Sequence, residues 1–397
     1  MHIITKSAHA RPTAQDSSGC SALQGAARGV RPLACLRLDG GRCDFNNKDE
    51  PLQDVSSRSW WLVRCLGLLL GLSVAVGIAG PAREAAAQGR HAARISILMA
   101  TGMPGGTNYR IGLGMASLWT TRLKATGIRV SAAISEGSGE NVEAIRIADA
   151  DLILAGSLFC STAYHGTGTY RGRPLRELRG IATLWRDVAH FLIRSDSAET
   201  GTLEDLQGLT LATGLPDSGN KLTTELLLRT LPSVRTDIRL RFMSDMAGAE
   251  ALRSGAVQAF DIMGGIPIPL VSSLFGERVA LEMLEIPDAS LQHLKNEGWK
   301  HFSRAVIPTG SYPGQRKPVK TVGFPAVLAT TASLAPEVVY ELTRTLFENL
   351  DSLAAVHPAC RSITLDNALT GLDIPLHPGA VRYYRERNIE IPAHLLP

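Results

Sequence analysis

The sequence lacks a strong excess of charge of either sign. Among 397 residues, 41 lysines and arginines nearly balance 37 aspartates and glutamates, which gives a formal net charge of +4. This balance argues against a role dominated by binding nucleic acid or another polyanion. Hydrophobic residues make up 45% of the chain, enough for a large buried core, and the length indicates two domains.

The chain also lacks an apolar run long enough to be a clear membrane span. The segment "WWLVRCLGLLLGLSVAVGIAG" has about thirteen apolar residues after Arg64, the length of a signal-peptide core, whereas a membrane span needs about 20. Arg58 and Arg64 precede this run, and the small residues of "AREAAAQ" follow it. The pattern predicts a signal peptide at residues 58–87, cleaved after Ala87, and therefore a periplasmic protein. A membrane anchor is the alternative interpretation.

Residues 1–57 precede this signal and show no apolar periodicity. We expect either a disordered leader or a start codon assigned too early, with Leu52 or Val55 as the true first residue. Without residues 1–87 the chain keeps 31 basic and 30 acidic residues, and two of its six cysteines. Nothing in the sequence places Cys160 and Cys360 together. We therefore expect buried thiols, with a disulfide as the alternative in an exported protein.

The rest of the chain has no signature of catalysis or of cofactor binding. The segment "GLPDSGNKLT" departs from a phosphate-binding loop, because Asn220 separates Gly219 from Lys221. The segment "EGSGE" lacks the first glycine of a serine-hydrolase elbow. The histidines are scattered without the spacing of metal ligands. The sequence therefore predicts no enzyme, no cofactor and no metal site.

What the sequence does contain is an alternation of short apolar runs with helical patterns. The first set predicts strands and helices in the order strand 94–99, helix 108–125, strand 128–134, helix 139–147 and strand 151–156. Such an order is typical of a parallel sheet with crossover helices. A second set follows residues 178–197, which contain two strand-like runs separated by "RD". Residues 333–356 predict one long helix with Ser333 as its N-cap.

The two sets of elements predict two α/β lobes. We expect the first part of lobe 1 at residues 92–186 and lobe 2 at residues 187–329. Residues 330–397 are then expected to return to lobe 1 and to add the C-terminal helices. Two crossings of the chain between lobes make a hinge.

Glycine-rich loops join a strand to a helix at three places: "GMPGGTNY", "EGSGEN" and "GLPDSGNK". Open α/β sheets bind ligands at the carboxyl ends of strands, where the first N–H groups of helices are free. The glycines allow a close approach, and short polar side chains add hydrogen bonds. The candidate residues are Gly105, Gly106, Thr107, Asn108, Ser138, Asn141, Ser218, Gly219 and Asn220. Such groups suit a small anion, although each loop taken alone is more often an ordinary helix cap.

These segments resemble the TAXI family of solute-binding proteins, the periplasmic subunits of TRAP transporters. The similarity extends from about residue 94 to 392 and includes "SEGSGENVEAIRIADADLILAGS" and the ending "PLHPGAVRYYRERNIEIP". It implies a type II-like periplasmic binding protein whose two lobes are mostly parallel sheets flanked by helices. It also implies further ligand contacts from Tyr109, Glu140 and Ser157. Met103 and Pro104 depart from the small residues usual in the family.

The resemblance implies a function as well as a fold. It implies capture of a small organic anion, a dicarboxylate or a glutamate-like compound, and its delivery to TRAP membrane subunits. No nucleic acid is expected as a partner. The alternative is an exported sensor of the same fold that presents its ligand to a signalling partner.

Overall fold

A computed structural model describes residues 94–216, 218–231, 237–277 and 279–397. The expected leader at 1–57 and the expected signal peptide at 58–87 lie outside these described residues. Of the helices in the described segments, none combines the length and the hydrophobicity that crossing a bilayer requires.

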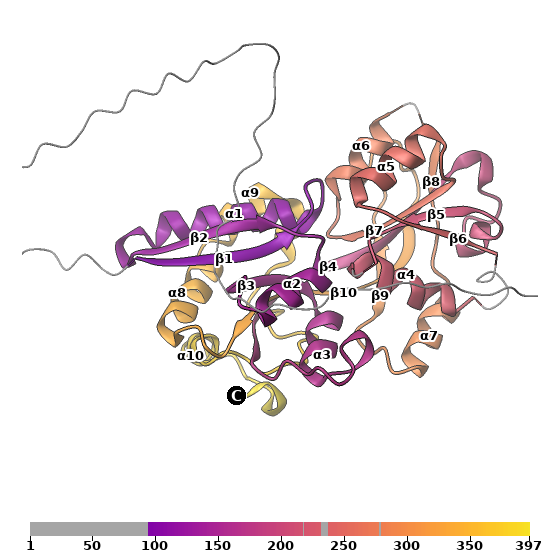
Figure 1. The fold of residues 1–397 in the computed structure, drawn as a ribbon. Helices are drawn as coiled ribbons and strands as arrows, with labels where there is room; N and C mark the ends of the chain where they lie inside the picture. Colours follow the sequence, from indigo (N-terminus) through magenta and orange to yellow (C-terminus); the bar gives the residue numbers. More distant parts are fainter. Residues whose placement is uncertain (1–93, 217, 232–236, 278) are drawn as a thin grey trace, which may run out of the picture. The chain divides into compact units, whose positions relative to one another are not determined.

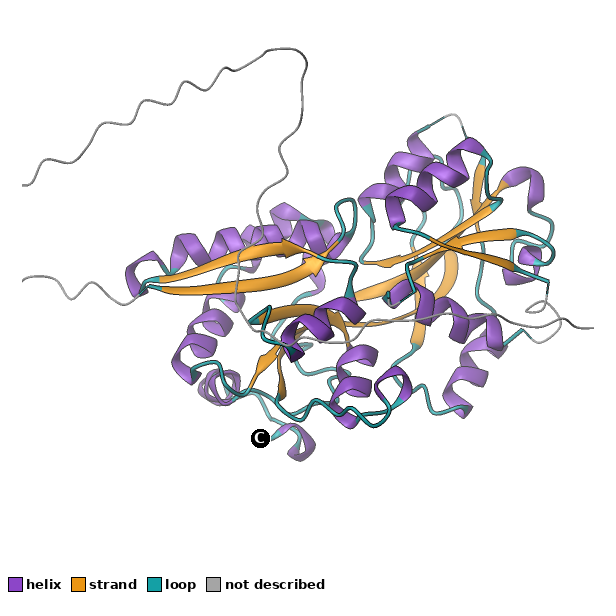
Figure 2. Cartoon of the chain, in the orientation of Figure 1, coloured by secondary structure: helices purple, strands orange, loops and turns teal. Residues whose placement is uncertain are grey.

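The strands of the described residues form one ten-stranded sheet (Figure 1). Its order is β2-β1-β3-β10-β4-β7-β5-β6, with β8 beside β4 and β9 beside β10. Helices lie around the strands (Figure 2), so the chain has a mixed α/β fold with a central sheet flanked by helices. Below, the first half means residues 94–177 and 332–397, and the second half means residues 195–318.

The first half contains the elements that the sequence predicts, in the predicted order. They are β1 (Ile95–Gly102), α1 (Thr107–Arg122), β2 (Ile128–Ile134), α2 (Ser138–Arg146), β3 (Leu152–Gly156) and α3 (Ser157–His165). Strand β1 is parallel to both β2 and β3. All five residues of β3 are buried, as expected for a strand covered on both faces. The predicted β-α-β-α-β order is therefore confirmed.

The second half repeats this arrangement. It contains β5 (Thr210–Thr213), α4 (Gly219–Arg229), β6 (Arg239–Phe242), α5 (Asp245–Ser254) and β7 (Ala259–Gly264). Strand β5 is parallel to β6 and β7. The sequence analysis did not predict the elements that follow, which are α6 (Pro269–Gly276), β8 (Leu281–Met283), α7 (Asp288–Asn296) and β9 (Ser303–Ile307).

Two long antiparallel strands, β4 (Leu178–Arg194) and β10 (Val319–Thr331), connect the two halves. The prediction of two short strands separated by "RD" is wrong, because β4 is continuous through Arg186 and Asp187. Arg186 is exposed and Asp187 is buried, which is the alternation of an extended strand and not a turn.

The partner of β4 changes part-way along the strand. β4 pairs with β10 as far as Val188, and from Val188 to Ile193 it pairs with β7 of the second half. Strand β10 likewise pairs with β9 over 319–323 and with β3 over 326–330. The two halves therefore meet within continuous strands.

The prediction of a single helix over 333–356 is also wrong. The segment forms α8 (Pro336–Phe347) and α9 (Leu350–Val356). Asn349 leaves the helical conformation, with φ of −134°, and its side-chain Nδ2 donates to Thr345 O at 2.8 Å. Asparagine side chains that bond to nearby backbone compete with helix continuation, so the helical pattern is interrupted here.

The expected N-cap of this helix is not the observed one. Helix α8 is preceded by Ala335, which makes no side-chain cap, and Pro336 occupies its first turn. Ser333 Oγ lies instead 2.7 Å from Thr331 Oγ1. Proline at the first position needs no N–H partner and fixes a helical φ, so the helix begins without the serine cap. The C-terminal helix, α10 (Pro378–Glu386), follows later in the chain.

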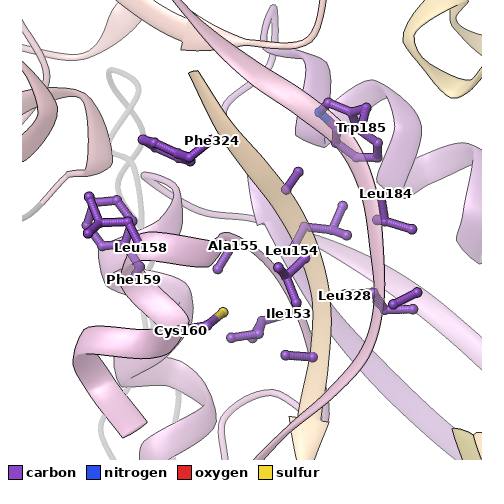
Figure 3. Close-up of a cluster of buried hydrophobic side chains, with 14 of the residues drawn as sticks. Ile153, Leu154, Ala155, Leu158, Phe159, Cys160, Leu184, Trp185, Phe324 and Leu328 are labelled. Carbon is purple, nitrogen blue, oxygen red and sulfur yellow. The ribbon is translucent and has the colours of Figure 1, made fainter. Parts of the chain in front are cut away.

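A buried cluster lies where β3, α3, β4 and β10 meet (Figure 3). Phe159 of α3 and Phe324 of β10 pack edge to face with ring centroids 6.4 Å apart. Gly156 ends β3 beneath them, and a Cβ there would lie 2.3 Å from Phe324 Cε2. Trp185 of β4 is also buried. This cluster holds the ends of the central strands in fixed positions.

Cys160 and Cys360 are both buried free thiols. Burial raises the pKa of each thiol to about 12. The expectation of two buried thiols is therefore confirmed.

Candidate functional site

A small cavity, the inner cavity, lies where the two halves meet. It is bounded by Gly102 at the end of β1, Met263 in β7 and Phe324 in β10. Its volume is about 60 Å³. Its other lining residues are Met103, Gly106, Thr107, Asn108, Tyr109, Glu136, Gly137, Ser138, Phe159, Asp187, Gly219, Asn220 and Asp245.

Three helices begin at the inner cavity. Their N-cap residues are Gly106 for α1, Gly137 for α2 and Ser218 for α4. Gly137 has φ of +105°, in the left-handed region that favours glycine. The Ser218 hydroxyl accepts a hydrogen bond from Lys221 N at 3.2 Å. The first N–H groups of a helix have no partner within it and carry partial positive charge, so backbone donors of both halves belong to residues that line the cavity.

Seven of the twelve site residues expected from the sequence line the inner cavity. They are Gly106, Thr107, Asn108, Tyr109, Ser138, Gly219 and Asn220. Two of these side chains also bond across the site: Thr107 Oγ1 donates to Gly265 O at 2.8 Å, and Asn220 Nδ2 donates to Asp245 Oδ1 at 2.8 Å. The three glycine loops, far apart in the sequence, thus come together at one place.

Three other expected residues lie away from both the inner cavity and the groove described next. Asn141 is buried, and its Nδ2 donates to backbone carbonyls of β1 and β3 at 2.9 and 2.7 Å. Ser157 is buried, and its hydroxyl has no hydrogen-bond partner among the described residues. Gly105 has φ of +92°, and its carbonyl accepts from Leu270 N at 3.2 Å. Asn141 and Gly105 thus support the elements around the site.

A larger groove, the outer groove, adjoins the inner cavity and shares Glu136 and Phe159 with it. Its volume is about 740 Å³, which is within the usual range for small-molecule sites. The groove lies between α2 and α4, and it contains the last two expected residues, Glu140 and Ser218. Its other lining residues are Gly139, Glu143, Thr169, Tyr170, Arg173, Leu215, Pro216, Lys221, Leu222 and Glu225.

The sequence analysis missed three acidic residues of the inner cavity: Glu136, Asp187 and Asp245. Asp187 is only 5% exposed, and its Oδ1 accepts a hydrogen bond from Trp185 Nε1 at 2.8 Å. Burial raises the pKa of Asp187 to about 7, although the hydrogen bond from Trp185 acts in the opposite direction. This carboxyl therefore titrates close to neutral pH.

Asp245 and Glu136 are partly buried at the same cavity. Burial raises the pKa of Asp245 to about 6; the hydrogen bond from Asn220 opposes the rise, and the nearby Glu136 adds to it. Burial also raises the pKa of Glu136, and Glu140 adds to that rise. No lysine or arginine is among the described residues that line the inner cavity, so its side chains are acidic overall.

Direct hydrogen bonds join the two halves beside the site. Besides the bond from Thr107 to Gly265, His357 of the first half donates from Nε2 to Pro267 O at 2.9 Å. His357 Nδ1 accepts a hydrogen bond from Ala359 N at 3.1 Å, which fixes the ring as the neutral Nε2–H tautomer. Burial lowers the pKa of His357, so this tautomer is maintained near neutral pH.

One known protein family matches most of this chain. Residues 99–387 match the NMT1-like family. The chain belongs to the NMT1-like family.

Solved structures similar to this NMT1-like protein include three binding proteins. One is the alkanesulfonate-binding protein SsuA from Xanthomonas axonopodis pv. citri bound to MOPS, at 16% identity over 76% of this chain and 94% of that one, with a TM-score of 0.40. The second is an ancestral arginine-binding protein bound to arginine, at 11% identity over 67% and 97%, with a TM-score of 0.39. The third is the substrate-binding protein of an amino acid ABC transporter, at 10% identity over 66% and 96%, with a TM-score of 0.40.

The site of this NMT1-like protein offers two kinds of group to a ligand. Backbone N–H groups at the starts of α1, α2 and α4 are donors for an anionic group. Carboxyl oxygens of Glu136, Asp187 and Asp245 are acceptors for donors or cations. In the described part of the chain, no group of three or more histidine, cysteine, aspartate or glutamate side chains could hold a metal ion. The arrangement is therefore suited to binding a small polar molecule.

Proposed function

We propose that this NMT1-like protein is an extracytoplasmic solute-binding protein that captures a small organic acid between its two halves. The proposal includes export through the signal peptide at residues 58–87 and a hinge in β4 and β10. A binding protein needs selectivity and a closure that its ligand stabilises, and it needs no catalytic group. The carboxylate of the acid would be bound by N–H groups at the helix starts, with charge-assisted hydrogen bonds of roughly 1.5–3 kcal/mol each.

The observation that carries the proposal is the convergence of three helix starts from two halves on one cavity. Helices α1 and α2 belong to the first half, and α4 belongs to the second. A ligand at this point makes all its bonds only when both halves are in place. It therefore favours the closed arrangement through its higher affinity for it.

The partner in this proposal is a TRAP-type membrane permease. It rests on the resemblance of residues 94 to 392 to the TAXI family, including the ending "HPGAVRYYRE". Copurification of the protein with the permease subunits encoded beside it would support this partner. Copurification with a sensor kinase in their place would contradict it.

A thermal-shift screen of the purified protein against small carboxylates and amino acids tests the proposal. A ligand present at 100 times its dissociation constant adds about 2.7 kcal/mol to the free energy of unfolding. We expect at least one organic acid to raise the melting temperature. Shifts from sugars alone, with none from any acid, would contradict an organic-acid ligand.

Asn108→Ala tests whether the ligand binds at the inner cavity. Asn108 lies in the first turn of α1 and lines the inner cavity, so its loss should weaken ligand binding about tenfold, or ~1.4 kcal/mol. Asn296→Ala is the matched control, because Asn296 ends α7 and lines neither the cavity nor the groove. Equal affinities of the two variants in a calorimetric titration would mean that the ligand lies elsewhere.

A further inference from the structure

The inner cavity contains a carboxyl oxygen that accepts no hydrogen bond from a described residue. Asp187 Oδ1 is engaged by Trp185, but no donor of the described residues lies within hydrogen-bond distance of its Oδ2. The residue is 5% exposed and lines the cavity. A carboxyl oxygen at a cavity wall without a donor is an available acceptor for a ligand that brings one.

A second acceptor in the cavity is held in place by a fixed amide. Asn220 Oδ1 accepts from Met263 N at 3.1 Å, which orients Asn220 Nδ2 toward Asp245 Oδ1 at 2.8 Å. Since the amide can point only one way, Asp245 stays at the cavity wall as an acceptor. Glu136 adds a third carboxyl group.

These groups discriminate between ligands with two carboxylates, which include dicarboxylates and glutamate-like compounds, and ligands with one carboxylate and one ammonium group. A dicarboxylate would bring further negative charge against three carboxyl groups, and like charges at one site disfavour each other. The helix starts offset this only in part, because each carries about half a unit of positive charge. An ammonium group has three donors and no acceptor, and it pairs with these carboxyls directly.

The sizes of the two spaces indicate where the rest of the ligand lies. The inner cavity holds about 60 Å³, whereas the outer groove beside it holds about 740 Å³. The smaller space suits one end of a ligand, and the larger one suits the rest of it. The outer groove contains the starts of α2 and α4, whose free N–H groups suit a carboxylate. Its basic side chains, Arg173 and Lys221, form ion pairs with Glu143 and Glu225 at 3.4 and 3.2 Å.

We propose that the ligand is an amino acid with its charges at opposite ends, whose protonated amino group enters the inner cavity at Asp187, Asp245 and Glu136 and whose carboxylate lies in the outer groove. This inference rests on the proposed function and names the ligand class of the same site. It assigns ligand recognition to three residues that the resemblance to the TAXI family does not imply as ligand contacts.

Three compounds of equal chain length test the inference by titration calorimetry with the purified protein. 5-Aminopentanoate carries one ammonium and one carboxylate, glutarate carries two carboxylates, and 1,5-diaminopentane carries two ammonium groups. We expect 5-aminopentanoate to bind at least tenfold more tightly than either of the others. Tighter binding of glutarate would overturn the inference and leave the proposed function intact. Failure of these three and of every solute in the thermal-shift screen would overturn both.

Substitutions of the aspartates at the inner cavity test where the amino group of the ligand binds. Asp187→Asn and Asp245→Asn should each weaken binding of 5-aminopentanoate at least tenfold and leave glutarate unaffected or more tightly bound. Asp149→Asn is the control, since Asp149 is exposed and lines neither space. If circular dichroism shows that one variant is unfolded, the other variant still tests the inference. Unchanged affinity for 5-aminopentanoate in a folded Asp187→Asn or Asp245→Asn protein would overturn the inference.

Discussion

Two serines cap helices of the second half in the same way. Ser218 Oγ accepts from Lys221 N at the start of α4, and Ser244 Oγ accepts from Ala247 N at the start of α5. Of the two, Ser218 lines the outer groove and Ser244 lines neither space. Substitutions of these two serines can therefore distinguish the loss of a helix cap from the loss of a ligand contact.

Replacing either serine by alanine should lower the free energy of unfolding by about 1 kcal/mol, because each removes an N-cap. Urea denaturation measures this loss. Only Ser218→Ala should also weaken the binding of an organic acid found in the screen. Equal affinities in Ser218→Ala and Ser244→Ala would show that Ser218 is a cap and nothing more.

Asp261 gives the protein a dependence of stability on pH. It is 2% exposed in β7, and its Oδ2 accepts from Thr224 Oγ1 at 2.6 Å. Burial raises the pKa of Asp261 to about 7, hydrogen bonds from Thr224 and Thr213 lower it, and the charge of Asp245 raises it further. The folded state thus binds this proton more tightly than the unfolded chain does. The stabilisation is fully present below pH 4 and is lost as pH rises through about 7.

Between pH 6 and pH 8 this one group should lower the free energy of unfolding by about 1 kcal/mol. Asp261→Asn should remove that part of the decrease, whereas Asp187 and Asp245, whose pKa values are also raised, should still contribute theirs. Urea denaturation of wild type, Asp261→Asn and the exposed control Asp149→Asn at both pH values measures the effect. The same decrease in Asp261→Asn as in wild type would contradict the assignment.

At the residue scale, local signals predicted some of the site and not the rest. Glycine, serine and asparagine before a helical pattern indicate where a helix starts. Asn108 and Asn220 lie at the cavity because helices start there. Asn141 carries the same signal, but its place in α2 turns it toward β1 and β3. Asp187 and Asp245 lie outside the glycine loops that the sequence analysis considered. They reach the cavity only through strand pairing and the packing of the second half.

At the element scale, β4 and β10 approach closely where the halves meet. A Cβ on Gly323 of β10 would lie 2.3 Å from the carbonyl oxygen of Asp187 in β4. Gly323→Ala should therefore force the two strands apart and lower the free energy of unfolding by about 1–3 kcal/mol. It should also weaken ligand binding, because Asp187 would shift.

The matched control for this substitution is Gly276→Ala. No atom lies within 4 Å of a Cβ on Gly276 at the end of α6, and alanine is the better helix former by up to about 1 kcal/mol. Thermal and urea denaturation of both variants test the comparison. A Gly323→Ala protein as stable as wild type would show that the strands can separate at no cost.

Two elements failed prediction for different reasons. The charged pair in β4 was interpreted as a break, yet the strand continues because β10 and β7 supply partners on both sides of it. The long helix pattern was interpreted as continuous, yet a side-chain bond of Asn349 interrupts it. Short-range periodicity identified the individual strands and helices well, but it carries no information on which distant strand will pair.

At the scale of the whole molecule, alternation of strands and helices predicted two α/β sets, and the structure contains both. It could not predict that one mixed sheet joins them, since β4 and β10 are more than a hundred residues apart. The lobe boundaries at 186/187 and 329/330 and the hinge between the lobes remain predictions.

Two histidines have the same local surroundings, but one forms a hydrogen bond between the two halves and the other forms a hydrogen bond within the first half. His357 and His377 each precede a proline, are buried, and accept a backbone N–H at Nδ1. His357 Nε2 donates to Pro267 O in the second half, whereas His377 Nε2 donates to Leu334 O within the first, both at 2.9 Å.

If ligand binding closes the two halves, the bond of His357 belongs to the closed arrangement alone. His357→Phe should then weaken ligand binding by about tenfold, the loss of one buried hydrogen bond, although His357 lines neither the inner cavity nor the outer groove. His377→Phe should lower the free energy of unfolding by a similar amount and leave affinity unchanged, because its bond is the same in both arrangements. Calorimetric titration and urea denaturation of the two variants measure both quantities. Equal affinities would mean that the halves keep one arrangement with and without ligand, since a bond made in both states cannot contribute to the difference between them.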